Sequence, residues 1–398
     1  MADTVLTLNA GSSSLKFALF DAEGGEDAGA MLRGMVEEIP TRPRFSASGA
    51  DGVSLAEEEW PEAAGDFAGI VDRLIDRIEA HLDDDRLIAV GHRVVHGGPD
   101  HAKPERVTPA LLAELGRLTR LAPLHEPQNI APIRALAEAR PGLTQIACFD
   151  TAFHHTMPAV ATRYALPRDF EAQGIRRYGF HGLSYEYIAG QLARAAPELA
   201  AGRVIVAHLG NGASLCALKA GKSVDTTMGF STLDGLVMGT RPGSLDPGVI
   251  LHLLKERGMT ADGIEDLLYR RSGLLGVSGG LSSDMRVLLG SDDPRAAEAV
   301  ELFAYRIARE AGALASSLGG LDGFVFTGGI GEHSSAVRAL VCARLDWLGL
   351  KIDAEANERG DGMISAPQSP VELRVIATDE ERMIASHVLR TVHAGRQA

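Results

Sequence analysis

A pattern of strand, small-residue loop and strand occurs twice in this sequence, and it restricts the fold more than any other feature. The first copy spans residues 5–20 with its loop at 10–14, and the second spans residues 204–218 with its loop at 209–214. Loops of Gly, Ser and Asn allow backbone N–H groups to converge on an anion, because no bulky Cβ keeps a phosphate away. One such loop indicates little, since ordinary hairpin turns use the same residues. Two loops at corresponding places indicate two related halves that hold a polyphosphate, as in a two-lobed phosphotransferase.

The size and charge of the chain limit its class and its partners. It has 398 residues, 45% of them hydrophobic, and a formal net charge of −14. This length predicts two or three domains with substantial cores. The negative charge predicts that neither nucleic acid nor an anionic membrane is a partner. A nucleotide would therefore need a local cluster of Arg and His side chains.

The cysteines and the first residues of the chain indicate in which cellular compartment the protein is expected. Cys148, Cys216 and Cys342 lack the spacing of metal ligands, so neither zinc nor a disulfide framework is expected. The start of the chain has no basic region ahead of an apolar run, and no stretch reaches membrane-spanning length. We expect a cytoplasmic protein with no membrane partner.

Apolar periodicity indicates alternating helices and strands in both halves. The predicted elements are helices over residues 67–82, 109–121 and 293–318, strands over 87–90, 144–149, 324–327 and 373–377, and a closing helix from 380. Residues 21–60 have weak periodicity and are predicted to form a peripheral hairpin or loop region. The pattern favours mixed sheets flanked by helices in two lobes.

Two short segments look like nucleotide motifs but fail on spacing. Residues 221–223 read Gly-Lys-Ser, but a P-loop needs Gly where Cys216 stands and a helix afterwards, so a hairpin turn is predicted. Residues 328–331 lack the spacing of a dinucleotide fingerprint, which argues against a nicotinamide cofactor.

Charged and polar residues lie beside glycines or at strand ends, where open α/β sheets bind ligands. They are Arg93, Asp150, His181, His208 and Arg241. Phosphoryl transfer needs cations and hydrogen-bond donors around the transferring group, together with a metal ion that bridges phosphate oxygens. Each residue alone has an ordinary explanation: a surface ion pair for an arginine, a core position for a histidine, a helix N-cap for Asp150. Their joint occurrence with both loops favours the phosphotransferase.

The sequence resembles the acetate and propionate kinase family, whose superfamily includes sugar kinases, actin and the heat-shock chaperone ATPases. The similar segments are residues 8–16, 91–98, 149–154, 177–182, 208–212, 238–241 and 378–381. They cover nearly the whole chain and occur in the family's order. The resemblance implies a two-lobed, duplicated actin-like and ribonuclease H-like fold. Its N-terminal lobe would comprise residues 1–150, completed by 380–398, and its nucleotide-binding lobe residues 151–379.

The resemblance also implies an activity. It is the reversible, ATP-dependent phosphorylation of acetate to acetyl phosphate by direct in-line transfer, with propionate as a secondary substrate. The implied cofactor is Mg²⁺, for which Mn²⁺ can substitute, and the implied partners are ATP or ADP, the short carboxylate or acyl phosphate, and a second copy of the chain in a homodimer.

Site residues are carried over by position. The metal ligands are Asn9 and Glu380. The acid-binding residues are Arg93, Val95, Leu124, Phe180 and Thr232. The catalytic residues are Asp150, as proton donor or orienting group, with His181 and Arg241, which stabilise the transition state. The nucleotide-binding residues are Lys16, His208, Leu209, Gly210, Asn211, Gly212, Asp284, Met285, Arg286, Gly329, Ile330, Gly331, Glu332 and His333.

The sequence departs from the family pattern at three of these segments. Thr232 stands where the family commonly has proline in the acyl pocket, which leaves the preference between acetate and propionate open. Asp379 replaces a usual asparagine and adds charge near the metal. His333 replaces a usual asparagine in the adenosine loop, so the nucleotide preference is also open.

Two other functions remain compatible with a two-lobed nucleotide fold. One is an ATP-dependent switch like the chaperone and actin relatives, which would not need the acid-binding set around Arg93. The other is a sugar kinase, which would need polar groups where Val95, Leu124 and Phe180 are apolar.

Overall fold

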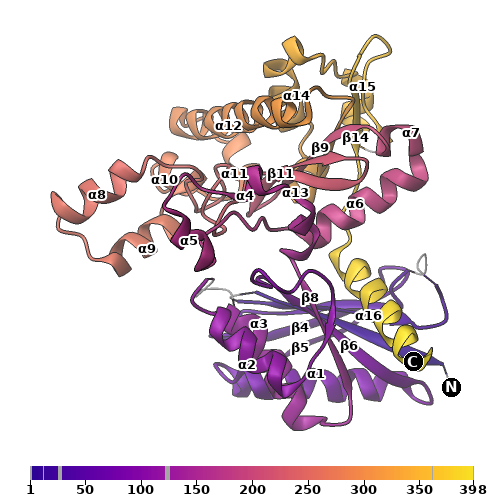
Figure 1. Ribbon diagram of the computed structural model, residues 1–398. Helices are drawn as coiled ribbons and strands as arrows, with labels where there is room; N and C mark the ends of the chain where they lie inside the picture. Colours follow the sequence, from indigo (N-terminus) through magenta and orange to yellow (C-terminus); the bar gives the residue numbers. More distant parts are fainter. Residues whose placement is uncertain (1, 12, 26–28, 122–125, 361, 398) are drawn as a thin grey trace. The chain divides into compact units, whose positions relative to one another are not determined.

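The computed structural model describes residues 2–11, 13–25, 29–121, 126–360 and 362–397 (Figure 1). By its internal contacts the chain divides into two compact units. The first comprises Met1–Phe153 together with Asp379–Ala398, and the second comprises His154–Thr378. Each unit is built around one mixed sheet.

The sheet of the first unit has the strand order β5-β4-β3-β2-β1-β6-β8-β7. Its strands are β1 (Asp3–Ala10), β2 (Leu15–Asp21), β3 (Leu32–Glu37), β4 (Arg44–Gly49), β5 (Ser54–Glu59), β6 (Arg86–Val94), β7 (Glu105–Arg106) and β8 (Thr144–Phe149). β1, β6 and β8 run parallel, whereas β2 to β5 form an antiparallel extension of the sheet. The carboxyl ends of β1, β6 and β8 therefore lie at one edge of the sheet.

Helices cover both faces of this sheet. On one face α1 (Phe67–Leu82) and α3 (Glu126–Ala139) pack on β6, and Val90 contributes to the core there. On the other face α16 (Glu380–Gln397) packs on β1, β6 and β8. Gly91, adjacent to Val90 and so on the α16 face, permits this approach. A Cβ at Gly91 would lie 2.4 Å from Ile384 Cγ2 and 2.6 Å from Val388 Cγ2.

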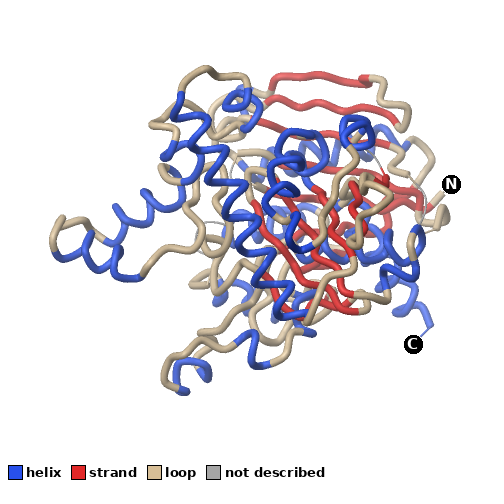
Figure 2. Tube along the Cα trace, turned by 90° about the horizontal axis from the view of Figure 1, so that it is seen from above, coloured by secondary structure: helices blue, strands red, loops and turns tan. Residues whose placement is uncertain are grey.

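The second unit has a sheet of order β11-β10-β9-β12-β14-β13. Its strands are β9 (Arg203–Leu209), β10 (Ala213–Lys219), β11 (Lys222–Thr226), β12 (Gly323–Thr327), β13 (Gly362–Met363) and β14 (Glu372–Val375). The helices packed on this sheet include α6 (Gly182–Ala195) and the long α12 (Pro294–Leu318). Figure 2 shows the strands in red beside the helices that cover them.

The two sheets repeat one connectivity. In the first, an antiparallel run β3-β2-β1 continues into β6 and β8, both parallel to β1. In the second, an antiparallel run β11-β10-β9 continues into β12 and β14, both parallel to β9. The repeated strand–loop–strand pattern of the sequence is therefore the first hairpin of each half. The prediction of a duplicated fold of mixed sheets flanked by helices is confirmed.

The local elements agree with the sequence in most places. α1 and α12 begin and end as predicted, and α2 (Pro109–Leu118) begins at the predicted cap, where the Thr108 side chain accepts a hydrogen bond from the Leu111 N–H. The predicted hairpin turn is present: Ala220 and Gly221 form it, at φ 50° and 72°, and Lys222 begins β11. None of the described helices is long and apolar enough to cross a bilayer.

The prediction for residues 21–60 is only partly right. Within this segment β3, β4 and β5 do form consecutive hairpins at the periphery, but these are regular strands that extend the main sheet. Alternation is weakest in β5, because it is an edge strand with mostly exposed side chains and neither of its faces forms a continuous apolar stripe.

Candidate active site

The carboxyl edge of the first sheet brings together residues that are far apart in sequence. Asn9 lies near the end of β1, Arg93 near the end of β6, and Asp150 directly after β8. The Arg93 guanidinium donates hydrogen bonds to Asp150 from Nε at 3.1–3.2 Å and from Nη2 at 2.6 Å. Its Nη1 donates to Asn9 Oδ1 at 3.1 Å. The parallel register of β1, β6 and β8 causes this convergence.

Charge is concentrated at this edge. The Asp150 side chain is 1% exposed and that of Arg93 20%. Burial by itself would lower the pKa of Arg93, but the carboxylates of Asp150 and Glu380 outweigh it and raise that pKa. These hydrogen bonds engage three of the five N–H groups of the guanidinium. Arg93, as the structure describes it, can therefore still bind a second carboxylate in the planar, two-point manner typical of arginine.

The start of α16 supplies further carboxylates to the same edge. Asn9 Nδ2 donates to Glu380 Oε2 at 3.4 Å, and Arg93 Nε lies 3.9 Å from the same oxygen. The pKa of Glu381 is raised by its burial and by the neighbouring Glu380 charge. Lys16 on β2 pairs in register with Asn9 and partly offsets that rise. The structure therefore brings Asn9, Lys16, Arg93, Asp150 and Glu380 into one cluster of the first unit.

The oxygen atoms in this cluster fit a magnesium ion better than a transition metal. Among the described residues, no group of three or more His, Cys, Asp or Glu side chains is placed to hold a metal. Mg²⁺ usually keeps several waters and takes only one or two protein carboxylates beside substrate phosphates. The amide oxygen of Asn9 and the carboxylate of Glu380 are a donor set of that kind.

Asn129 on α3 is a buried residue that the sequence analysis missed. Its Oδ1 accepts the Val95 N–H at 2.9 Å, and its Nδ2 donates to the Ala10 carbonyl at 2.8 Å. One amide therefore ties the last residue of β1 to the residue that follows β6, next to Asn9 and Arg93. A polar residue in the otherwise apolar stretch 129–133 was the only signal in the sequence.

Glu126, at the start of α3, was missed as well. It is fully buried, and its Oε2 accepts the His96 N–H at 3.3 Å. Its Oε1 has no hydrogen-bond partner among the described residues. Burial raises the pKa of Glu126 to about 8, and the charge of Asp150 adds to the rise. This carboxyl is therefore neutral at neutral pH.

In the second unit His181 is held by backbone and side chain together. It is the N-cap of α6 and has a left-handed backbone, with φ 59°. Its Nδ1 is hydrogen-bonded to Ser214 Oγ at 2.8 Å, and Ser214 Oγ lies 2.5 Å from Tyr185 Oη. The His181 ring stacks on His208 with centroids 4.4 Å apart. These contacts fix the ring and leave its Nε2 directed away from Ser214.

His181 and Arg241 converge on the second glycine loop. A Cβ at Gly212 would lie 2.8 Å from Arg241 Nη2 and 3.2 Å from His181 Nε2. A side chain at this position would therefore push both groups away from the loop. Arg241 is held in turn by the Thr232 carbonyl, which accepts from its Nη1 at 2.8 Å. Two nitrogen-bearing side chains thus flank one loop, as stabilisation of a phosphoryl group requires.

The predicted acyl-pocket residues are divided between the units. Val95 is buried in the first unit, whereas Phe180 and Thr232 are buried in the second. Leu124 lies outside the described residues, as does Ser12 of the first loop. Arg177 supports the Thr232 segment, because its Nη1 donates to the carbonyls of residues 226, 227 and 228 at 3.0 Å each.

The predicted adenosine segment is helical. Residues 329–333 belong to α13 (Gly328–His333), which begins directly after β12. Glu332 Oε1 accepts the N–H groups of Gly328 at 2.8 Å and Thr378 at 3.0 Å, so its carboxylate positions the backbone. The buried Arg338 donates to the carbonyls of Gly331 and Glu332.

The other predicted nucleotide segment, residues 284–286, contains the N-cap of α11 (Met285–Leu289). The Asp284 carboxylate accepts from the Arg286 N–H and pairs with the exposed Arg286 guanidinium. Met285 is buried.

Comparison with known proteins gives a consistent result. A sequence model described as the acetokinase family matches residues 4–386. The chain is 57% identical to an acetate kinase of Rhodopseudomonas palustris, and the match covers all of both chains.

Comparison with solved structures agrees with the sequence comparison. A propionate kinase from Francisella tularensis superposes with a TM-score of 0.89 at 36% identity, covering 97% of this chain and 98% of that one. Acetate kinase from Porphyromonas gingivalis gives a TM-score of 0.86 at 37% identity, covering 98% and 100%. The chain therefore belongs to the acetokinase family.

Proposed function

We propose that the protein transfers the γ-phosphoryl group of ATP directly to acetate, reversibly, and that it accepts propionate as a secondary substrate. The observation that carries the proposal is the placement of His181 Nε2 and Arg241 Nη2 against the Gly212 loop. Membership of the family decides against a nucleotide-dependent switch without acid chemistry and against a sugar kinase.

Each unit has its own part in the proposed reaction. Arg93 binds the carboxylate of the acid, and Asp150 holds the guanidinium in place through its hydrogen bonds. His181 and Arg241 donate to the phosphoryl oxygens as charge develops on them in the transition state. The loop at 210–212 admits the phosphates because Gly210 and Gly212 carry no side chains.

A magnesium ion belongs to this proposal. Asn9 and Glu380 would hold it, and when bound it would neutralise charge on the phosphate oxygens. Lys16, beside Asn9 in the hairpin register, contacts the nucleotide. The carbonyls and N–H groups of residues 329–333, held in place by Arg338 and Glu332, form the adenosine contact.

A homodimer and a cytoplasmic location complete the proposal. α8 (Pro247–Lys255) has no buried residue, and Leu245, Val249, Leu251 and Leu254 around it are 39–52% exposed. An apolar surface of this kind is typical of an interface between subunits. The three cysteines are buried and are not joined in disulfides, which fits a reducing compartment. Sedimentation of the wild type and of Leu251→Glu measures the oligomeric state.

The function is tested by trapping acyl phosphate with hydroxylamine. The purified protein is supplied with ATP and Mg²⁺ and with formate, acetate, propionate or butyrate in turn. We expect the highest kcat/KM with acetate and a lower value with propionate, because one methylene in an apolar pocket changes binding by about 1–3 kcal/mol. Preference for butyrate, or no acyl phosphate with any of the four, would contradict the proposal.

A further inference from the structure

Three consecutive acidic residues lie at the start of α16, and one of them, Asp379, forms a two-point ion pair with an arginine. Asp379, Glu380 and Glu381 form this sequence, at the point where the chain returns to the first unit. Glu380 contacts Asn9, and Glu381 is half-buried. Asp379 pairs with Arg33 on β3: Nη1 donates to Oδ1 at 3.3 Å and Nη2 to Oδ2 at 2.5 Å.

Asp379 also caps α16. Its Oδ1 accepts the Arg382 N–H at 2.9 Å, and its carbonyl accepts the Met383 N–H at 3.1 Å. One carboxylate therefore links β3 to the first turn of the helix that carries Glu380. At its other end this turn is fixed by Ile384, which packs directly on Gly91 of β6.

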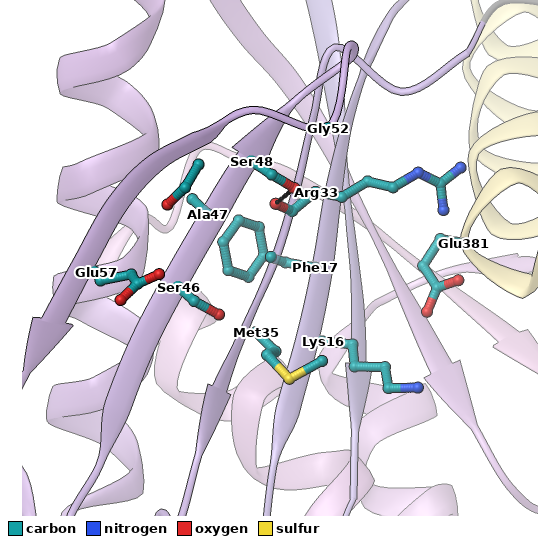
Figure 3. A pocket seen from close by; sticks show the side chains of 12 residues that line it. Lys16, Phe17, Arg33, Met35, Ser46, Ala47, Ser48, Gly52, Glu57 and Glu381 are labelled. Carbon is teal, nitrogen blue, oxygen red and sulfur yellow. Dashed lines mark hydrogen bonds between the residues drawn. The ribbon is translucent and has the colours of Figure 1, made fainter.

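Arg33 lies beside the cluster on an open face of the sheet. It lines a cavity of about 450 Å³ with Lys16, Glu381 and the serines of β4 and β5. In the view of Figure 3 the Glu381 carboxylate lies between the Arg33 guanidinium and the Lys16 ammonium group. The side chain of Arg33 is 44% exposed and that of Asp379 17%, so solvent screens the pair only in part.

We propose that Arg33 is a positioning residue of the metal site: it neutralises Asp379, so that the Mg²⁺-binding end of α16 keeps the charge set by Glu380 and Glu381. This inference rests on the proposed function, which places Mg²⁺ at Asn9 and Glu380. An unpaired Asp379 would add a negative charge close to the cation, and an unpaired Arg33 would add a positive one. The two residues therefore compensate each other.

The test compares Arg33→Gln, Asp379→Asn and the double variant. Asparagine retains the N-cap oxygen and removes the charge, so the helix start is preserved. Titration calorimetry measures the binding of ADP with Mg²⁺ and, separately, of ADP in EDTA, and thermal unfolding monitors stability. The quantity compared is the gain in ADP affinity that Mg²⁺ produces. We expect Arg33→Gln to increase this gain by about two- to fivefold and Asp379→Asn to decrease it by a similar factor. The double variant should return to within about twofold of the wild type.

Arg42→Gln is the matched control. Arg42 pairs with Glu59 on the same antiparallel extension of the sheet, so this variant loses the same charge and the same kind of ion pair away from α16. It should leave the Mg²⁺ dependence unchanged.

Weaker Mg²⁺ binding in Arg33→Gln, or a double variant no closer to the wild type than the single ones, would overturn the inference. Failure of the proposed function has a different signature. If Glu380→Gln keeps the same Mg²⁺ dependence of ADP binding as the wild type, the metal site itself is misplaced. If Glu380→Gln abolishes the Mg²⁺ dependence while the Arg33 and Asp379 variants do not shift it, only this inference fails.

Discussion

Replacement of Glu126 by glutamine should stabilise the first unit at neutral pH. A carboxyl group whose pKa is raised by folding, here from 4.5 to about 8, holds its proton more tightly in the folded state than in the unfolded state. Its contribution to stability is therefore fully present below pH 4.5 and is lost as the pH rises toward about 8. At pH 7 the unfolded carboxyl has ionised and the folded one has not, which costs about 3 kcal/mol of unfolding free energy.

Glutamine does not ionise, so it removes this cost while it retains an oxygen for the His96 N–H. The glutamine NH₂ group takes the place of the O–H group of the neutral carboxyl. Among the described residues no acceptor faces this Oε1 position, so the O–H and the NH₂ are equally unsatisfied there. We therefore expect Glu126→Gln to raise the free energy of unfolding at pH 7 by about 2–3 kcal/mol. Below about pH 5 the two proteins should be nearly equal in stability.

The assay is urea unfolding between about pH 5 and pH 8, followed by tryptophan fluorescence. The chain has two tryptophans: Trp60 is fully buried in the same unit as Glu126, whereas Trp347 is 74% exposed in the other unit. The emission change therefore reports mainly on the unit of interest. Glu138→Gln, at an exposed position of the same helix, is the control. It should change the free energy of unfolding by no more than about 0.5 kcal/mol. Parallel pH profiles for the wild type and Glu126→Gln would refute the reasoning.

Three further outcomes can be measured. Arg241→Ala and His181→Ala should each lower kcat by about 10²–10³-fold with a much smaller effect on ATP binding, because their donors act on the transition state; near-normal turnover in both would remove them from the mechanism. Thr232→Pro should change the ratio of kcat/KM for acetate and propionate by less than about tenfold, and a larger change would mean that this position dominates selectivity. Gly91→Ala should destabilise the first unit by about 1–3 kcal/mol, since its Cβ would lie 2.4 Å from Ile384 Cγ2; an unchanged melting temperature would show that α16 can shift without cost.

Sequence by itself determined the elements whose causes are local. Thr108 caps α2 and Asp293 caps α12, because the accepting side chain and the N–H groups that it caps lie within a few residues. The two hairpins of the repeat follow from apolar runs on either side of small residues. Their occurrence at corresponding places in the two halves predicts the duplicated fold. Asn9, Arg93 and Asp150 could be expected at one edge because the ends of parallel strands meet there. Whether each candidate side chain performs its assigned role remains a prediction.

Tertiary structure decided everything that depends on partners distant in sequence. Asn129 reaches a carbonyl 119 residues away, and Arg33 reaches Asp379 across 346 residues. Nothing near Arg33 in the sequence distinguishes it from a solvated strand residue. The protonation of Glu126 is set by complete burial beside the Asp150 charge, which a helix start with an acidic residue does not reveal. β5 too was recognisable only in the sheet, because an edge strand has one hydrogen-bonded neighbour and little apolar burial to mark it.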